Sequence, residues 1–591
     1  MASPLREEPP LSVQVDPTLL TPRPSAPIPV TLTIDVSGSD LLQGRIRFEP
    51  TFGFPGYETA PLTLREGEQS YRCVLPAIEP GANDVAVPVI WYSADGAEFN
   101  LGRHVVAHSA RALYPYAIAR CRPVGSVTEI EPLELERVQQ LRLQDRRRRS
   151  FGTQIHEFTP EEFPADVHSL CAYDMVVLPG SGLVELDPNA LRRLEDWLRA
   201  GGVLAVALRP DLPADQRGFL DRVAGAIPEV DGVRSGAVDL GRVAIFSDGV
   251  DVPEDRRAEV VHELLRLRPT MRDRAQRGEA LYHVESPFRG HEPTLPEAIA
   301  ALPALLGMND VEVLPVGVVV VFLLGLVLLV GPIDRVGLGW IRRRSWTWVT
   351  VPIVCIAATL VFVELSEWYV GANDTGSLTV IDLGEDGRVL RQYRFELSFP
   401  ARHDVRQLQL SHQIVERFEV RDRYDPQPRT DSRIRGRFPA EYELAFGELK
   451  WTPYVLSRFR IGGPLFDESV AVPTIEPSPA EETPTVQLGG WGIDAQESVK
   501  GSYDRAVAVS VDGLRVRRRG ARHRDDLGAQ TIARMSTVPS QERGSLVSGV
   551  APTGGRDLEG LPVAGEAEYV LGVLATRGVH HYFFRRKFEH E

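Results

Sequence analysis

The chain has 591 residues, of which 43% are hydrophobic and 25% charged, and its formal net charge at pH 7 is -15. This length is too great for a single hydrophobic core and predicts several domains. The acidic balance argues against a general nucleic-acid binder, which needs a basic face to displace counterions from phosphates.

Residues 1–110 are predicted to form a β-sandwich. Segments 29–36 and 45–49 alternate apolar and polar side chains with a period of two, and 71–75 and 85–92 repeat this pattern between Gly/Pro turns. Such alternation is typical of strands that bury one face. We therefore expect a small antiparallel sandwich.

One turn in this region carries the pattern of a cation site. Asp35, Ser37 and Ser39 match the DxSxS signature of von Willebrand factor A domains, in which a carboxylate and two hydroxyls hold a hard cation such as Mg²⁺. That fold continues into a helix, whereas residues 41–49 have the pattern of a strand. We therefore expect a hairpin connection and no metal, and keep a cation-dependent, adhesion-like module as a rival interpretation.

Residues 111–305 are predicted to form a parallel α/β domain. Strands alternate with helices at a spacing that favours a parallel sheet with helices on both faces. The predicted strands are 116–120, 173–178, 203–207 and 243–246, and the predicted helices are 133–143, 188–200 and a segment around 260–265.

The clearest of these helices follows Asp187. Asp187 is a good N-cap, Pro188 suits the first helical position, and Gly201 and Gly202 end the helix. Its apolar stripe consists of Leu191, Leu194, Trp197 and Leu198.

Two apolar runs near the middle predict a transmembrane hairpin. Residues 312–331 and 347–366 are each long enough to cross a bilayer core of roughly 30 Å as a helix. The predicted loop between them, 332–346, is basic, whereas the outer flanks of the hairpin are acidic. The positive-inside rule therefore puts this loop in the cytoplasm and both large regions outside. The loop arginines are Arg335, Arg342, Arg343 and Arg344, and the flanking acids are Asp310, Glu312, Glu364 and Glu367.

The N-terminus conflicts with that orientation. Residues 1–10 lack the basic start and apolar stretch of a secretory signal, although roughly 300 residues would have to be translocated. Three explanations stay open: an upstream start, a signal already removed, or an exception to the positive-inside rule.

Residues 370–591 are predicted to be a β-rich domain with mobile loops. A hairpin is expected from 378–383, through a Gly-Glu-Asp-Gly turn, to 389–399. A linker or exposed loop is expected at 473–484, a mobile, polar and Gly/Ser-rich segment at 515–552, and closing strands at 569–574 and 582–584.

The stretch 173–207 resembles class I glutamine amidotransferase-like domains. Residues 174–180 match the loop on the oxyanion side of that fold, and 194–204 are similar to its following helix and strand. This resemblance implies a flavodoxin-like parallel sheet. Together with Gly331-Pro-Ile-Asp334 and the basic loop, residues 10–400 look like a group of bacterial membrane proteins of unknown function. Genes of that group often lie beside genes for MoxR-type ATPases and von Willebrand A-domain proteins. This resemblance implies a role in assembly at the cell envelope.

The resemblance does not extend to the catalytic machinery. Enzymes of that superfamily use a cysteine on a tight strand-to-helix turn, activated by a histidine and a carboxylate. The corresponding turn here is Leu208-Arg209-Pro210, which contains no Cys or Ser. We therefore assign no catalytic residue. A residual hydrolase or amidotransferase would use Cys171 or Ser181, but Cys171 precedes a strand and Ser181 lacks the GxSxG spacing.

The four cysteines show no CxxC pair or Cys/His cluster, so neither a zinc site nor a disulfide framework is predicted. For Cys121 and Cys171, one bridge in an oxidising compartment and two buried free thiols both stay open.

These patterns predict a membrane-anchored, non-catalytic scaffold or binding protein of the bacterial cell envelope. It would lie in the cytoplasmic (inner) membrane with its large domains extracytoplasmic. Its expected partners are the lipid bilayer and other envelope or membrane proteins, with no cofactor, metal or nucleic acid. The sequence makes no prediction of oligomeric state.

Overall fold

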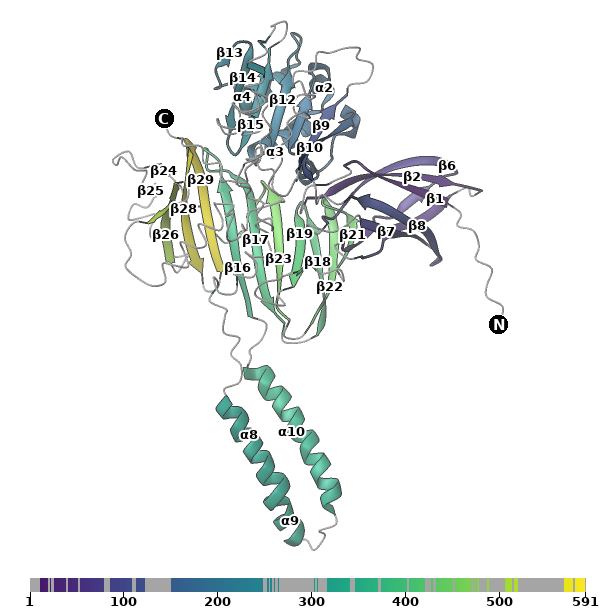
Figure 1. Ribbon diagram of the computed structural model, residues 1–591, viewed down its shortest axis with the longest axis vertical. Helices are drawn as coiled ribbons and strands as arrows, with labels where there is room; N and C mark the ends of the chain where they lie inside the picture. The colour runs from purple at the N-terminus through teal and green to yellow at the C-terminus, as the bar shows by residue number, and fades with distance from the viewer. Residues whose placement is uncertain are drawn as a thin grey trace.

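The computed structural model describes residues 11–122 and 150–247 with short gaps, isolated positions from 252 to 306, residues 316–340 and 346–369, most of 374–470, and strands between 476 and 518 and from 568 to 589. Figure 1 shows a β-rich region in the middle, an α/β unit above it, the N-terminal strands to one side and a helical hairpin below. The predicted class, a multidomain α/β plus β-rich protein, is confirmed.

The N-terminal strands form two facing sheets, as predicted. The first sheet is antiparallel and has the order β1-β2-β6. Alternate side chains of β2 and β7 are buried between the sheets, where Ile34, Phe48 and Trp91 are fully enclosed. The strands are β1 (Leu11–Pro17), β2 (Ile28–Val36), β3 (Leu42–Phe48), β4 (Gly56–Thr59), β5 (Leu62–Leu64), β6 (Gly67–Leu75), β7 (Val85–Ser93) and β8 (Glu98–Ala107).

The turn after Asp35 leads into a strand, as expected, but it is not a hairpin. β2 belongs to the three-stranded sheet, whereas β3 belongs to the second sheet. The connection therefore crosses from one layer of the sandwich to the other.

The second sheet is shared between the two ends of the chain. Its order is β18-β22-β21-β4-β3-β7-β8, with β5 beside β3. β18 (Asp404–Ser411), β21 (Arg433–Arg437) and β22 (Glu441–Glu448) come from beyond the helical hairpin. β21 runs parallel to β4, with Arg433 opposite Gly56 and Gly436 opposite Thr59. The predicted boundaries 1–110 and 370–591 therefore do not separate two sheets.

The α/β unit contains a parallel sheet of five strands in the order β10-β9-β11-β12-β15, extended by an antiparallel pair, β14 and β13. In chain order the parallel strands read 2-1-3-4-5, which is the order of flavodoxin-like sheets. The strands are β9 (Leu113–Cys121), β10 (Ser150–Phe158), β11 (Met175–Leu178), β12 (Val203–Ala207), β13 (Glu229–Val230), β14 (Val233–Val238) and β15 (Gly241–Phe246).

The helices of this unit are short. The predicted helix after Asp187 is present as α3, and the Asp187 carboxylate accepts a hydrogen bond of 2.7 Å from Ala190 N. The predicted helices 133–143 and 260–265 lie outside the described residues, apart from isolated positions. The described ones are η1 (Pro160–Glu162), η2 (Val167–Ala172), α2 (Gly180–Glu185), α3 (Pro188–Arg199) and α4 (Ala214–Ala224).

The β-rich region contains a nine-stranded sheet in the order β20-β19-β23-β17-β16-β29-β28-β26-β27. The predicted hairpin and closing strands are present as β16–β17 and β28–β29. Within the predicted linker lies part of a two-stranded ribbon, β24 (Glu476–Pro477) with β25 (Val486–Gln487). The sheet strands are β16 (Asp374–Leu383), β17 (Val389–Phe399), β19 (Ile414–Glu419), β20 (Gln427–Pro428), β23 (Tyr454–Ile461), β26 (Arg505–Asp512), β27 (Arg515–Arg518), β28 (Glu568–Arg577) and β29 (His580–Glu589).

The central hairpin consists of two helices that are long and apolar enough to cross a membrane, over residues 317–340 and 347–364. The first is built from α8 (Val316–Leu328), a π-helical turn (Leu329–Ile333) and α9 (Asp334–Trp340), and the second is α10 (Thr347–Tyr369). Most of the predicted loop 332–346 is therefore helical. The wider π-turn accommodates Pro332, which has no N–H to donate. Thr350 Oγ1 donates a 2.7 Å hydrogen bond to Asp334 across the hairpin.

Candidate functional site

The β-rich region docks against the amino ends of the parallel strands of the α/β unit. Arg391 Nη1 donates to the carbonyl of Ala200, just before β12, at 2.8 Å. Glu385 N donates to Asp239, just before β15, at 3.2 Å. Figure 1 shows the turn between β16 and β17 reaching this edge beneath α3. We call this contact the domain junction; it leaves the carboxyl ends of the strands on the opposite edge.

Ligands of open parallel sheets bind at the carboxyl edge, where the strand order reverses. Here that point lies between β9 and β11, beside Cys121 and the segment Gly180–Gly182. A Cβ added to Gly182 would lie 2.8 Å from Cys121 Sγ, and one added to Gly180 would lie 2.3 Å from Arg209 Cγ. Both glycines are thus needed for close packing, and the described part of this crevice is filled by the protein itself.

The nucleophiles considered from the sequence do not converge. Ser181 lies at the carboxyl edge, whereas Cys171 is fully buried on η2 at the amino edge. Cys121, a thiol the sequence analysis did not consider as a nucleophile, lies nearer to the Ser181 segment, but burial raises its pKa to about 12 and keeps it protonated. Neither Cys121 nor Cys171 forms a disulfide, so the open question of a bridge is answered against it.

A carboxylate–histidine pair does lie at the domain junction, but both ring nitrogens of the histidine already make hydrogen bonds. His168 Nδ1 donates to Asp166 Oδ1 at 2.7 Å, and Nε2 accepts from the backbone N–H of Ile461 at 3.0 Å. Because an amide can only donate, Nε2 is the acceptor in this second bond. Both ring nitrogens are therefore in use, and His168 is positioned as a structural link rather than a general base.

Asp166 connects three segments of the chain. Besides binding His168, it accepts a 2.6 Å hydrogen bond from Nδ1 of His412, which follows β18. Burial alone would raise the pKa of Asp166, but the hydrogen bonds from His168 and His412 outweigh it and bring the pKa down to about 2. The carboxylate is thus ionised at every physiological pH.

A second carboxylate at the junction is held by two arginines. Asp382 is buried and accepts from Arg391 Nε at 2.7 Å and from Arg585 Nη2 at 2.8 Å. Burial opposes ionisation, but Arg585 and Arg391 keep the pKa of Asp382 below its ordinary value. Arg391 also reaches the Ala200 carbonyl, so this cluster anchors the C-terminal end of α3 to the sheet.

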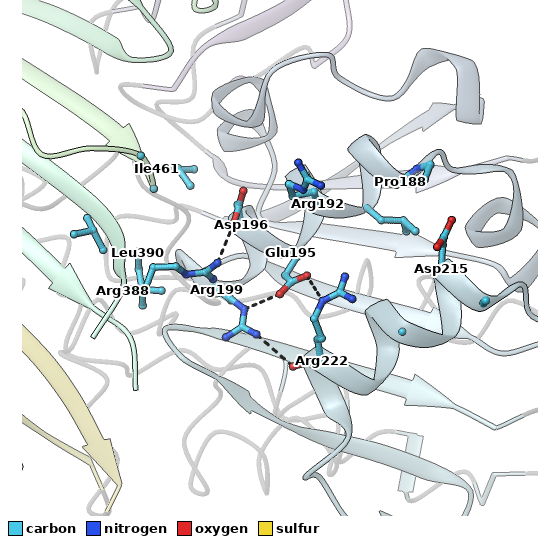
Figure 2. A pocket seen from close by; sticks show the side chains of 16 residues that line it. Pro188, Arg192, Glu195, Asp196, Arg199, Asp215, Arg222, Arg388, Leu390 and Ile461 are labelled. Carbon is cyan, nitrogen blue, oxygen red and sulfur yellow. Dashed lines mark hydrogen bonds and ion pairs between the residues drawn. The ribbon is translucent and has the colours of Figure 1, made fainter. Parts of the chain in front are cut away.

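Beside the junction a cleft of about 880 Å³ opens between α3, α4 and the β-rich region. Figure 2 shows α3 side chains facing Leu390 and Ile461 on one side and Asp215 of α4 on the other. We call it the α3–α4 cleft. Its lining is Pro188, Leu191, Arg192, Glu195, Asp196, Arg199, Ala214, Asp215, Gly218, Arg222, Arg388, Val389, Leu390, Ile461, Gly462 and Gly463.

Charges of both signs line the α3–α4 cleft. Glu195 bridges Arg199, at 3.1 Å, and Arg222, at 2.9 Å, and is almost wholly buried (Figure 2). Arg388 lies 3.8 Å from Asp196, whose pKa is raised by burial in spite of that arginine. The lining contains no Cys, Ser or His. The cleft therefore has the groups for binding a charged chain but not those for nucleophilic catalysis.

The suspected cation site gains no ligands from the fold. Asp35 and Ser37 are exposed at the end of β2, and Ser39 lies outside the described residues. Within the part of the chain that the structure describes, no cluster of three His, Cys, Asp or Glu side chains is placed to hold a metal.

No protein-family model and no curated protein matches the chain.

The α3–α4 cleft was not visible in the sequence, because residues 188–222 meet 388–390 and 461–463 only in three dimensions. At the domain junction, one local signal was present in the sequence. Asp166 stands two residues before His168, which is a spacing at which an Asp side chain caps the start of a helix.

Proposed function

We propose that this protein is a membrane-anchored, non-catalytic binding protein of the bacterial cell envelope, and that its α3–α4 cleft holds a charged segment of a partner protein. The observation that carries this proposal is the cleft itself, a two-sided opening with an apolar floor and paired charges.

The chemistry of the lining favours a polypeptide. Leu191, Leu390 and Ile461 supply apolar contact, while Arg192 and Asp215 are exposed on opposite walls. A segment with both acidic and basic side chains would satisfy both walls. The lining carries four arginines beside three carboxylates, so a segment of mixed charge suits it better than the uniformly negative backbone of a nucleic acid.

The packing of the α/β unit supports a role without catalysis. The turn after β12 has no nucleophile, Cys121 is protonated beneath Gly182, and both nitrogens of His168 are occupied. The fold, which resembles the amidotransferase type in sequence, would serve as a rigid wall of the binding cleft.

The proposal also includes the side of the membrane on which the soluble regions lie. β4 and β21 pair in one sheet although they flank the hairpin in sequence, so both soluble regions must lie on the same side. The arginines of the 332–346 segment favour the cytoplasm for the hairpin's tip, which would make that shared side extracytoplasmic.

Site-specific photo-crosslinking in native membranes tests the cleft. A photoreactive amino acid at Arg192 or at Asp215 should give the same discrete product with one partner protein. The matched control carries it at Arg437, an equally exposed arginine on β21. Products that are identical at Arg437, or absent from both cleft positions, would contradict the proposal.

The rival hydrolase is tested separately with thiol- and serine-directed activity probes on the full chain. Stoichiometric labelling that disappears in Cys171→Ala or Ser181→Ala would overturn the non-catalytic part of the proposal. We expect labelling no greater than that of heat-denatured protein.

A further inference from the structure

One rung of the nine-stranded sheet carries three polar side chains side by side. Thr379 of β16 lies opposite Arg394 of β17, which lies opposite Arg458 of β23. Paired residues of neighbouring strands project from the same face, so the hydroxyl and the two guanidinium groups share one surface. We call these three residues the arginine rung.

The arginine rung contains donors without acceptors. Thr379 is 2% exposed, and its Oγ1 has no hydrogen-bond partner. The Nε atoms of Arg394 and Arg458 are also buried without a partner. Unmade hydrogen bonds at buried donors are costly, and like charges directly opposite in a ladder repel. Three such defects in adjacent positions indicate that a shared acceptor is missing.

The surrounding charges do not balance the rung. Among the described residues the nearest carboxylate is Glu396, at 3.9 Å from both Arg394 and Arg458, which is beyond hydrogen-bond distance. Glu396 is shared with a third arginine, Arg406, at 3.5 Å. Arg406 also lies 3.7 Å from Glu448. Three guanidinium groups therefore share two carboxylates, and the excess is one positive charge.

We propose that the arginine rung binds a small oxyanion of the phosphate class. Such an anion offers several acceptor oxygens, which suit the planar donor fork of arginine and the Thr379 hydroxyl. The side chains of Arg394 and Arg458 are 18% exposed and that of Arg406 is 29% exposed, so an ion can reach them from solvent.

The position of the rung favours a free anion over a lipid headgroup. β16 begins at Asp374, close to the end of α10, and Thr379 lies five residues further along. At about 3.3 Å per residue the rung is roughly 17 Å beyond that end of the strand. A headgroup held in the bilayer would not extend that far into the sheet.

Thermal unfolding of the full chain in detergent tests this site. We compare 20 mM phosphate with chloride at equal ionic strength, for the wild type and for Arg458→Gln. Phosphate should raise the wild-type Tm by several degrees. Arg458→Gln should show no such shift, and it should melt higher than the wild type in chloride because the Arg394–Arg458 repulsion is gone.

The matched control is Arg437→Gln, which removes one positive charge at an exposed position and should keep the full phosphate shift. A shift that persists in Arg458→Gln, or no shift in the wild type, would overturn the proposal. If Arg458→Gln does not fold, Thr379→Val serves instead, and radioactive phosphate binding by equilibrium dialysis should be several-fold weaker than for the wild type. Equal binding to Thr379→Val and wild type would also overturn it, and binding only to vesicles with anionic lipid would assign the site to a headgroup.

Discussion

Two junctions hold this protein together, and they are built in different ways. The first joins the N-terminal strands to the strands beyond the hairpin through a backbone ladder between β4 and β21. The second, the domain junction, seats the α/β unit on the β-rich region through a few polar side chains, chiefly Asp166, His168 and Arg391. Asp382 holds Arg391 in place from within the nine-stranded sheet.

The comparison shows where the protein is sensitive to change. A ladder spreads its stability over several backbone hydrogen bonds, which substitutions other than proline leave in place. The domain junction concentrates it in ionised groups that are buried, and each such group is costly to leave unpaired. Substitutions should therefore act strongly on the domain junction and weakly on the ladder.

The largest effect is expected from Asp382→Ala. This change leaves Arg391 and Arg585 buried without their carboxylate, which should lower the free energy of unfolding by about 3–5 kcal/mol. Chemical denaturation of the purified full chain measures it. Arg437→Ala, which breaks an exposed pair with Glu441, should cost no more than about 1 kcal/mol. A similar small loss for Asp382→Ala would show that the domain junction does not depend on this cluster.

A smaller, pH-dependent effect is expected at Asp166. Its pKa is lowered to about 2 from an ordinary value of 3.8, so the ionised carboxylate favours the folded state. That stabilisation is complete above about pH 4 and is lost as the pH falls through about 2; it amounts to about 2 kcal/mol. The difference in unfolding free energy between wild type and Asp166→Asn should shrink across this window. A difference that stays constant from pH 6 to pH 2 would contradict the assignment.

The smallest effect is expected at the ladder. Tyr57→Phe removes a single hydrogen bond of 3.0 Å from the Tyr57 hydroxyl to the carbonyl of Gly436, so the loss should be about 1 kcal/mol. Tyr71→Phe removes an exposed bond to Thr63 and a half-buried one to Gln69, neither of which crosses the ladder, and is the control for urea denaturation. A loss above 3 kcal/mol for Tyr57→Phe alone would show that this junction, too, depends on a side chain.

Local signals predicted much of the fold. The Asp187-Pro188 start and the apolar stripe through Trp197 predicted α3, and the Gly-Glu-Asp-Gly turn predicted the β16–β17 hairpin. Both depend on residues within a few positions of one another. The apolar runs predicted the helical hairpin, but the helix continues through Pro332 because a π-turn absorbs it, so the loop is shorter than expected.

Contacts between distant residues were not predictable in this way. β4 has only four residues, and nothing near it indicates that its partner is β21. The same limit applies to the α3–α4 cleft and to the arginine rung, where Arg394 and Arg458 look like ordinary exposed positions of alternating strands until the register is known. The hydrogen bond from the Ile461 amide to His168 was likewise not predictable from the sequence, because it joins residues 293 positions apart.

The shared sheet also has a consequence for biosynthesis, because its two parts are synthesised at different times. Tyr57 and Gly436 are 379 residues apart, so the outer edge of β4 emerges long before β21 exists. At roughly 5–20 residues per second, ribosomes would leave that edge open for about 20–75 s. During this interval β4 presents unpaired backbone groups that attract other strands. The N-terminal sheet is therefore complete only after the chain beyond the helical hairpin has been synthesised and β21 has paired with β4.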